Sequence, residues 1–336
     1  MENRELRIEV LLEDVVRRRA SDLHIQVGLP PMLRIDGALT PVAGFGPLDE
    51  AQVERLVFAI LDQDQQQVLM KDKEFDFSFA FGNLGRFRVN AFHERGNLAA
   101  ALRLIPNEIK SVTELGMPPV VMTFADFPRG LVLVTGPTGS GKSTTLAALI
   151  DKINTEKSHH IITIEDPIEF VHPSKKALIN QRELHQHTHS FANALRSALR
   201  EDPDVILVGE MRDPETIGLA LTAAETGHLV FGTLHTTGAA KTVDRIVDVF
   251  PAGEKEMVRS MLSESLRAVI SQTLLKTRDG NGRVAAHEIL ISTPAVRNLI
   301  RENKIAQINS TLQTGQAHGM QTLDQALQAL VRQGTI

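Results

Sequence analysis

The chain has 336 residues, of which 42% are hydrophobic and 23% are charged, so we expect a soluble globular protein of two or three domains. It contains no cysteine, which excludes disulfides and thiolate zinc sites. Its net charge of −5 argues against a nucleic-acid-binding protein, because such domains normally carry a basic surface.

The sequence gives no indication of a membrane-inserted segment. Residues 1–19 are charged throughout and lack the apolar core of a secretory signal. No stretch approaches the ~20 apolar residues that are needed to span a bilayer. We therefore expect a cytoplasmic protein that contacts a membrane complex without direct membrane insertion.

Residues 1–105 predict a compact α+β domain. Apolar residues recur at helical spacing over residues 5–19, and a second helix is expected over residues 49–71. Between these helices the pattern alternates, which predicts short strands separated by turns at residues 30–31 and 36–37.

A hairpin gives the clearest strand pattern of this first domain. Phenylalanines alternate with small or polar residues over 75–81, residues 82–83 turn the chain, and alternation resumes over 87–91. The two strands should therefore have one buried and one polar face. A further strand is expected over residues 99–105.

A proline-containing linker at residues 106–118 precedes a second domain at residues 119–336. Short apolar strands alternating with helices indicate an α/β fold, with a parallel sheet covered on both faces. The expected strands are residues 131–135, 161–165, 205–208 and 228–234. The expected helices are residues 142–154, 190–200 and 214–227, the last capped by Asp213. The remainder, about residues 241–336, is predicted to be helical.

A phosphate-binding loop, or P-loop, is the most specific motif in the chain. Residues 136–143 match its pattern at every required position, between an expected strand and an expected helix. Backbone N–H groups of such a loop surround the phosphates, Lys142 reaches the β- and γ-phosphates of ATP, and the Ser143 hydroxyl binds Mg²⁺. The predicted nucleotide-binding residues are Gly136, Pro137, Thr138, Gly139, Ser140, Gly141, Lys142, Ser143 and Thr144.

Two carboxylates at expected strand ends are candidates for the hydrolytic chemistry. Hydrolysis needs a water in line with the γ-phosphate and a group that orients it and takes its proton. Glu210 follows the apolar strand 205–208 and is the first choice as general base. Gly209 stands where an aspartate commonly precedes this residue. Glu165 is a second candidate for orienting water or Mg²⁺, with a solvated acidic loop as the alternative.

Histidines and arginines provide further candidate contacts. His228 and His235 flank the strand 228–234, where an imidazole could sense the γ-phosphate, although satisfied strand-end histidines are the alternative. Arg86, Arg88 and Arg103 lie on polar strand faces of the first domain. They could reach phosphates bound by another domain or subunit, or they could be ordinary surface charges.

Three alternating histidines form a weaker pattern. His185, His187 and His189 would share one face of an extended segment, as metal ligands can. No carboxylate or cysteine set accompanies them, so a solvated loop is the favoured interpretation.

Together these motifs resemble the type II/IV secretion ATPase family and, within it, the retraction ATPases of type IV pili. The resemblance runs along nearly the whole chain. Its most specific pieces are residues 21–24 (SDLH), 85–92 (GRFRVNAF), 136–143, 163–170 (TIEDPIEF), 208–213 (VGEMRD), 227–236 and 295–302 (AVRNLIRE). Val296 stands where the family usually has isoleucine, and His187 where it usually has aspartate.

The resemblance implies a PAS-like first domain, a RecA-like second domain and a homo-hexameric ring. ATP would bind between domains, with Arg86, Arg88 and Arg103 as candidate phosphate contacts. The ring would dock on the cytoplasmic side of the inner-membrane platform protein and remove pilin at the pilus base during twitching motility. The helix that carries Arg297 and Arg301 would serve retraction rather than nucleotide binding.

Four alternatives are less well supported. A secretion or pilus-extension ATPase of the same superfamily generally carries extra N-terminal domains and often a four-cysteine zinc module. A retraction-associated paralogue is disfavoured by the intact 295–302 signature. A RecA-like nucleic-acid motor needs a basic track or stacking aromatics. A nucleotide-binding regulator without turnover does not need both Glu165 and Glu210.

Overall fold

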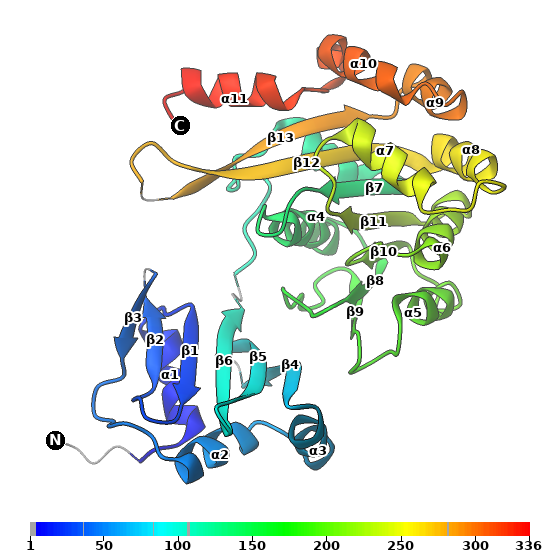
Figure 1. The fold of residues 1–336 in the computed structure, drawn as a ribbon. Helices are drawn as coiled ribbons and strands as arrows, with labels where there is room; N and C mark the ends of the chain where they lie inside the picture. The colour runs from blue at the N-terminus through cyan, green and yellow to red at the C-terminus, as the bar shows by residue number, and fades with distance from the viewer. Residues whose placement is uncertain (1–4, 36, 83, 106–107, 281) are drawn as a thin grey trace. The chain divides into compact units, whose positions relative to one another are not determined.

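The computed structural model describes residues 5–35, 37–82, 84–105, 108–280 and 282–336. The chain divides into two compact units, Met1–Glu108 and Ile109–Ile336 (Figure 1). Among the described residues, none of the helices combines the length and the apolar content that crossing a bilayer requires.

The first unit is an antiparallel sheet with helices packed against one face. Its described strands lie in the order β3-β2-β1-β6-β5-β4. Leu11 and Val53 from the helices pack with Leu23, Phe87 and Leu102 from the sheet. The elements are α1 (Ile8–Arg17), β1 (Asp22–Gln26), β2 (Met32–Ile35), β3 (Ala38–Pro41), α2 (Glu50–Phe58), α3 (Gln63–Asp72), β4 (Glu74–Phe81), β5 (Gly85–Glu94) and β6 (Asn97–Ile105).

The hairpin of strands β4 and β5 follows the phenylalanine pattern. Phe79 lies opposite Phe87 in the register, and their rings stack with centroids 5.9 Å apart. Phe77 and Phe87 are buried in the core of the unit. The expected turn at residues 82–83 includes Asn83, which lies outside the described residues.

The single helix expected over residues 49–71 is wrong, because the chain forms α2 and α3 instead. Asp62 begins a new helix with a capping box. Its side chain accepts the backbone N–H of Gln65 at 2.8 Å, and the Gln65 side chain accepts the backbone N–H of Asp62 at 3.1 Å. Asp49 and Gln52 form the same arrangement at the start of α2. The two reciprocal caps, in the pattern D-x-x-Q, set the separate starts of the helices.

The second unit is a mostly parallel sheet in the order β13-β12-β7-β11-β10-β8-β9, with β13 antiparallel to β12. Its strands are β7 (Gly130–Thr135), β8 (His160–Glu165), β9 (Leu178–Glu183), β10 (Val205–Val208), β11 (Leu229–Leu234), β12 (Leu266–Lys276) and β13 (Arg283–Ile291). Its helices are α4 (Lys142–Glu156), α5 (Phe191–Ala198), α6 (Pro214–Glu225), α7 (Ala239–Asp248), α8 (Lys255–Ser265), α9 (Pro294–Arg301), α10 (Ile308–Thr314) and α11 (Leu323–Arg332), with 3-10 turns η1 (Pro119–Asp126), η2 (Ile305–Gln307) and η3 (Gly315–His318).

Two apolar clusters cover the faces of this sheet. One packs helices α6, α7 and α8 against it through residues such as Leu221, Ile246 and Leu262. The other packs η1 and α4 through residues such as Phe124 and Leu149. The mixed α/β class predicted from the sequence is confirmed.

Two boundaries differ from expectation. The region 241–336 is not wholly helical, because β12 and β13 extend the sheet beyond β7. Residues 268–270 of β12 form a buried apolar run, and so short a run has no period that separates strand from helix. The linker expected at 106–118 is also shorter, since Val112 and Met117 are buried in the second unit and residues 106–107 lie outside the described part.

The second capping box can be tested by thermal unfolding. Asp62→Ala removes the acceptor for the Gln65 N–H, and the loss of such a cap costs about 1 kcal/mol. We expect a lower unfolding midpoint for the first unit. Asp64→Ala, in the first turn of the same helix but outside the cap, is the matched control. It should lower the free energy of unfolding by only a few tenths of the roughly 1 kcal/mol expected for the cap. An equal decrease of the unfolding midpoint in the two variants would contradict a cap at Asp62.

Candidate active site

The phosphate-binding loop connects the end of β7 to the start of α4, whose first residue is Lys142. Three of its glycines have positive φ, 141° at Gly136, 77° at Gly139 and 90° at Gly141, which other residues rarely adopt. A Cβ at Gly136 would also lie 2.2 Å from the carbonyl oxygen of Gln272. The loop therefore has the tight backbone that lets N–H groups at a helix N-terminus surround an anion.

The other predicted loop residues differ in burial. Pro137 and Thr138 are exposed, whereas Ser140 is buried. Ser143 and Thr144 lie in the first turn of α4 and are partly buried. Pro137, Thr138, Ser143 and Thr144 therefore keep contact with solvent, whereas Gly136 and Ser140 are buried.

The Lys142 ammonium bends back over its own loop. Its Nζ donates to the carbonyl oxygens of Gly136, at 2.9 Å, and Pro137, at 3.2 Å. Burial lowers the pKa of Lys142, while the nearby charges of Glu210 and Glu169 act in the opposite direction. Since these residues follow β10 and β8, the loop and both acidic segments share one electrostatic environment.

Glu210 and His235 meet at the ends of neighbouring strands. Glu210 Oε1 lies 3.0 Å from His235 Nε2, and the Arg212 guanidinium pairs with both carboxylate oxygens, its Nη2 at 2.7 Å from Oε2. Burial opposes ionisation of Glu210, but Arg212 and His235 together hold its pKa below its usual range. Glu210 is therefore a carboxylate at neutral pH, in contact with the guanidinium of Arg212 and the imidazole of His235.

Close strand packing explains the glycine before Glu210. A Cβ at Gly209 would lie 3.0 Å from the carbonyl oxygen of Ile164 and 3.1 Å from the Cα of Glu165. The backbone N–H of Gly209 donates to that same Ile164 oxygen at 2.7 Å. An aspartate side chain therefore has no room here without separating β10 from β8.

Glu165 lies at the end of β8, and its carboxyl group is not part of a solvated loop. Its Oε1 accepts the Thr163 hydroxyl at 2.6 Å and the Gln181 side-chain amide at 3.1 Å. Burial raises the pKa of Glu165 to about 7, although these hydrogen bonds favour the charged form. Near neutral pH the carboxyl therefore exchanges between its protonated and ionised forms.

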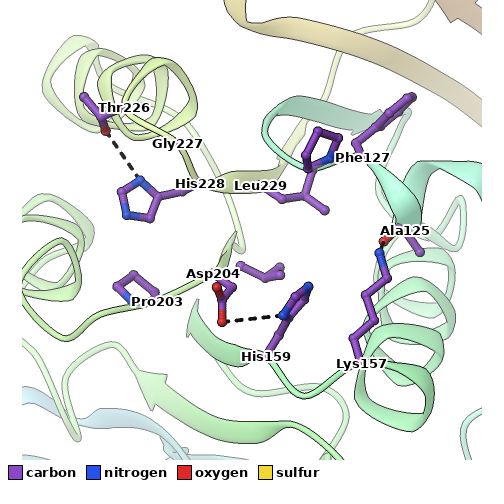
Figure 2. A pocket seen from close by; sticks show the side chains of 12 residues that line it. Ala125, Phe127, Lys157, His159, Pro203, Asp204, Thr226, Gly227, His228 and Leu229 are labelled. Carbon is purple, nitrogen blue, oxygen red and sulfur yellow. Dashed lines mark hydrogen bonds and ion pairs between the residues drawn. The ribbon is translucent and has the colours of Figure 1, made fainter.

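His228 does not join this group of residues. It precedes the first residue of β11, whereas His235 follows the last, so the two histidines lie at opposite edges of the sheet. His228 lines a cavity of about 380 Å³ together with Phe127, His159 and Asp204, all labelled in Figure 2. Its Nδ1 lies 2.9 Å from the carbonyl oxygen of Ala223. In its own chain His228 therefore lies away from the phosphate loop, as the alternative of a satisfied strand-end histidine allows, and its contact with a γ-phosphate stays a prediction.

Arg86, Arg88 and Arg103 lie on β5 and β6 of the first unit. Arg88 and Arg103 are exposed and opposite each other in the register. Arg103 Nε donates to Asp22 Oδ1 at 2.8 Å, and Arg86 Nη2 donates to Ser78 Oγ at 2.5 Å. The three arginines share one face of the first unit's sheet, which is a different sheet from the one that carries the phosphate loop.

Metal binding by the protein alone is not supported. Across the described ranges, no group of three or more histidine, aspartate or glutamate side chains is arranged to hold an ion. This finding includes His185, His187 and His189. His187 instead accepts the backbone N–H of Glu183 on Nδ1 at 2.9 Å.

Two residues that contact the site, Arg212 and Gln272, were not predicted from the sequence. Arg212, which pairs with Glu210, stands two positions after it in the motif 208–213 and could have been included. Gln272 donates to the Ser140 carbonyl oxygen at 2.7 Å and accepts the Thr145 hydroxyl at 2.9 Å. No pattern near Gln272 points to this contact, because its partner Ser140 is 132 residues away in the sequence.

Comparison with known proteins agrees with this arrangement. The family model for type II/IV secretion system proteins matches residues 4–336. A twitching motility protein of Neisseria gonorrhoeae is 69% identical over 306 residues, 91% of this chain and 82% of the relative. The type IV pilus retraction ATPase PilT of Pseudomonas aeruginosa is 61% identical over 329 residues, 98% of this chain and 95% of the relative. A crystal structure of the pilus retraction motor PilT with bound ADP has a TM-score of 0.93 and 51% identity, and the match covers 99% of this chain and 95% of that one. The chain therefore belongs to the type II/IV secretion system protein family.

Proposed function

We propose that this protein is an ATP-hydrolysing motor that powers the retraction of type IV pili. The observation that carries the proposal is the Glu210–His235 contact at the sheet edge that also bears the phosphate loop. The 61% identity to a type IV pilus retraction ATPase, over nearly the whole length of both chains, supports the choice of motor.

The phosphate loop and Lys142 bind the substrate. The positive-φ glycines orient the backbone N–H groups, and Lys142 transfers its two hydrogen bonds from the loop carbonyls to the β- and γ-phosphates. Ser143 is the protein ligand that fits Mg²⁺, because this cation binds through few protein oxygens, substrate phosphates and waters. Bound Mg²⁺ neutralises charge that develops on the phosphate oxygens.

Glu210 orients the attacking water. A carboxylate has about four acceptor positions on its two oxygens. Arg212 and His235 occupy both positions of Oε1, and a second Arg212 nitrogen occupies one of Oε2. One position on Oε2 is left for a water, and His235 lies within hydrogen-bond distance of the same carboxylate, where it can respond to the γ-phosphate.

Assembly completes the motor in this proposal. The first unit is PAS-like and the second RecA-like, and six copies form a ring at the cytoplasmic face of the inner membrane. Arg86, Arg88 and Arg103 then serve as candidate phosphate contacts from a neighbouring domain or subunit. The ring acts on the platform protein and the pilus base.

Helix α9 is the candidate element for retraction. It packs into the core through Val296 and Ile300, while Asn298 and Arg301 are exposed. Arg301 pairs with Glu264 on α8 at 2.5 Å. The helix therefore presents polar groups on a firmly packed support, as a contact for a partner requires.

Glu210→Gln tests the hydrolytic site. The amide keeps the size of the side chain but cannot take a proton, so we expect kcat to fall by about 100-fold or more, with the Kd for ATP within about threefold of wild type. Phosphate release and equilibrium binding measure the two effects. Glu215→Gln, at an exposed acid on α6, is the control and should keep full activity. Normal turnover in Glu210→Gln would remove this residue as the base.

Glu165→Gln tests the protonation state of the second carboxyl. The folded-state pKa of about 7 lies above the ordinary value of 4.5, so stability from the protonated group is full below pH 4.5 and is lost as pH rises through 7. Glutamine mimics the protonated form. We expect the variant to unfold with the wild-type free energy near pH 4.5 and to be more stable by up to ~3 kcal/mol at pH 8.

Glu210→Gln is the control for this measurement, because the pKa of Glu210 is lowered whereas the pKa of Glu165 is raised. Its lowered pKa gives stability that is present above pH 4.5 and is lost as the solution becomes more acidic. The difference in unfolding free energy between Glu210→Gln and wild type should therefore stay constant between pH 5 and pH 8. A constant difference for Glu165→Gln over the same range would show that Glu165 is not buried as a neutral acid.

Arg297→Ala combined with Arg301→Ala tests the role of α9. Val296 and Ile300 keep the helix packed, so ATP hydrolysis should stay within about twofold of wild type. Pilus retraction, scored by twitching of cells that carry the variant, should fail. Arg332→Ala, at an exposed arginine of α11, is the control and should retract normally. Loss of hydrolysis together with retraction would mean that α9 has only a structural role.

A further inference from the structure

Gln272 connects the phosphate loop to a strand of the C-terminal hairpin. It follows Ser271, the last residue of β12 that pairs with β7, and its side chain is 3% exposed. Its Nε2 donates to the Ser140 carbonyl oxygen at 2.7 Å, and its Oε1 accepts the Thr145 hydroxyl at 2.9 Å. One amide therefore joins the last part of the loop to the first turn of α4.

Both ends of this amide are needed at the same time. The Ser140 carbonyl requires a donor and the Thr145 hydroxyl requires an acceptor, and Thr145 is itself buried. The main chain of Gln272 also faces the loop, since its carbonyl oxygen occupies the space that a Cβ at Gly136 would need. Gln272 therefore contacts the loop near its start and near its end.

Ser271, the residue before Gln272 on β12, contacts the segment that follows His235. Successive side chains on a strand point to opposite faces. The Ser271 hydroxyl oxygen accepts the backbone N–H of Gly238 at 2.8 Å, and Glu288, opposite Ser271 on β13, accepts the N–H of Ala239 at 2.7 Å. Gly238 and Ala239 begin α7, three residues after His235. Strand β12 therefore sets the spacing between the phosphate loop and the segment that follows His235.

We propose that Gln272 is a positioning residue for the phosphate loop. It holds the Ser140–Gly141 backbone in the conformation whose N–H groups donate to phosphate oxygens, so the loop does not have to be reordered at each binding event. This inference rests on the proposed function, because it concerns the binding of the same nucleotide. Gln272 acts on the substrate through the loop and does not contact the reacting atoms.

Gln272→Met tests this role in the full-length protein. Methionine has a similar length and volume but offers neither the donor nor the acceptor. We expect the KM for ATP and the Kd for Mg·ADP to rise by about tenfold or more, while kcat stays within about twofold, because a loosened loop weakens ground-state and transition-state binding equally. A purely structural role would lower the unfolding temperature without this split between KM and kcat.

Gln321→Met is the matched control. The side-chain amide of Gln321 donates to the carbonyl oxygen of His287 at 2.8 Å. His287 lies on β13 of the same unit, away from the phosphate loop. Removal of the Gln321 amide should lower stability and leave KM and Kd near wild type. Equal KM and Kd values in the two variants would overturn the proposal.

Thr145→Val keeps the test decisive if Gln272→Met does not fold. It leaves the glutamine in place and removes only the hydroxyl that Oε1 accepts, so KM should rise by about threefold with kcat unchanged. An unchanged KM would overturn the role of Gln272. A wild-type protein that neither binds Mg·ADP nor hydrolyses ATP would instead overturn the proposed function, which is a separate result.

Discussion

The parallel register of β7, β11, β10 and β8 is the constraint on which the site depends. Leu234 pairs with Thr135 and Val208 pairs with both Gly232 and Ile164, so these strands end at one edge of the sheet. Carboxyl ends of parallel strands are where such sheets bind ligands. The phosphate loop, the Glu210–His235 pair and Glu165 each begin where one of these strands stops. A slip of one residue would turn every buried side chain of a strand to the other face, so the apolar core fixes the geometry of the site.

The two carboxyl groups at this edge have opposite protonation behaviour, and their surroundings explain why. Arg212 and His235 keep Glu210 ionised, whereas burial raises the pKa of Glu165 to about 7 despite the hydrogen bond from Thr163. Carboxylates that differ in this way can take different roles in one reaction. Glu210 is suited to orient and deprotonate water. Glu165 is suited to hydrogen bonding within the site and carries less charge to repel a triphosphate.

Elements and site residues could be predicted from the sequence wherever the pattern that specifies them is local. The phosphate loop, strand β10 and the start of α6 each follow from a motif, an apolar run or a cap within a few residues. Long-range packing could not be predicted in the same way. Neither the place of β12 beside β7 nor the bond from Gln272 to Ser140 has a local pattern, since both join segments over 130 residues apart. The separation of His228 from His235 was not evident from the sequence, because flanking a strand does not indicate which sheet edge a residue occupies.

The most direct test of the account measures phosphate release by the purified wild-type chain with Mg·ATP, together with its mass by light scattering. We expect steady ATP hydrolysis by a species of six chain masses, because the proposed site is completed by arginines of a neighbouring domain or subunit. A monomer that binds ATP tightly and releases no phosphate would contradict it. Such a result would indicate a nucleotide-dependent regulator or a motor that is inactive without its membrane partner.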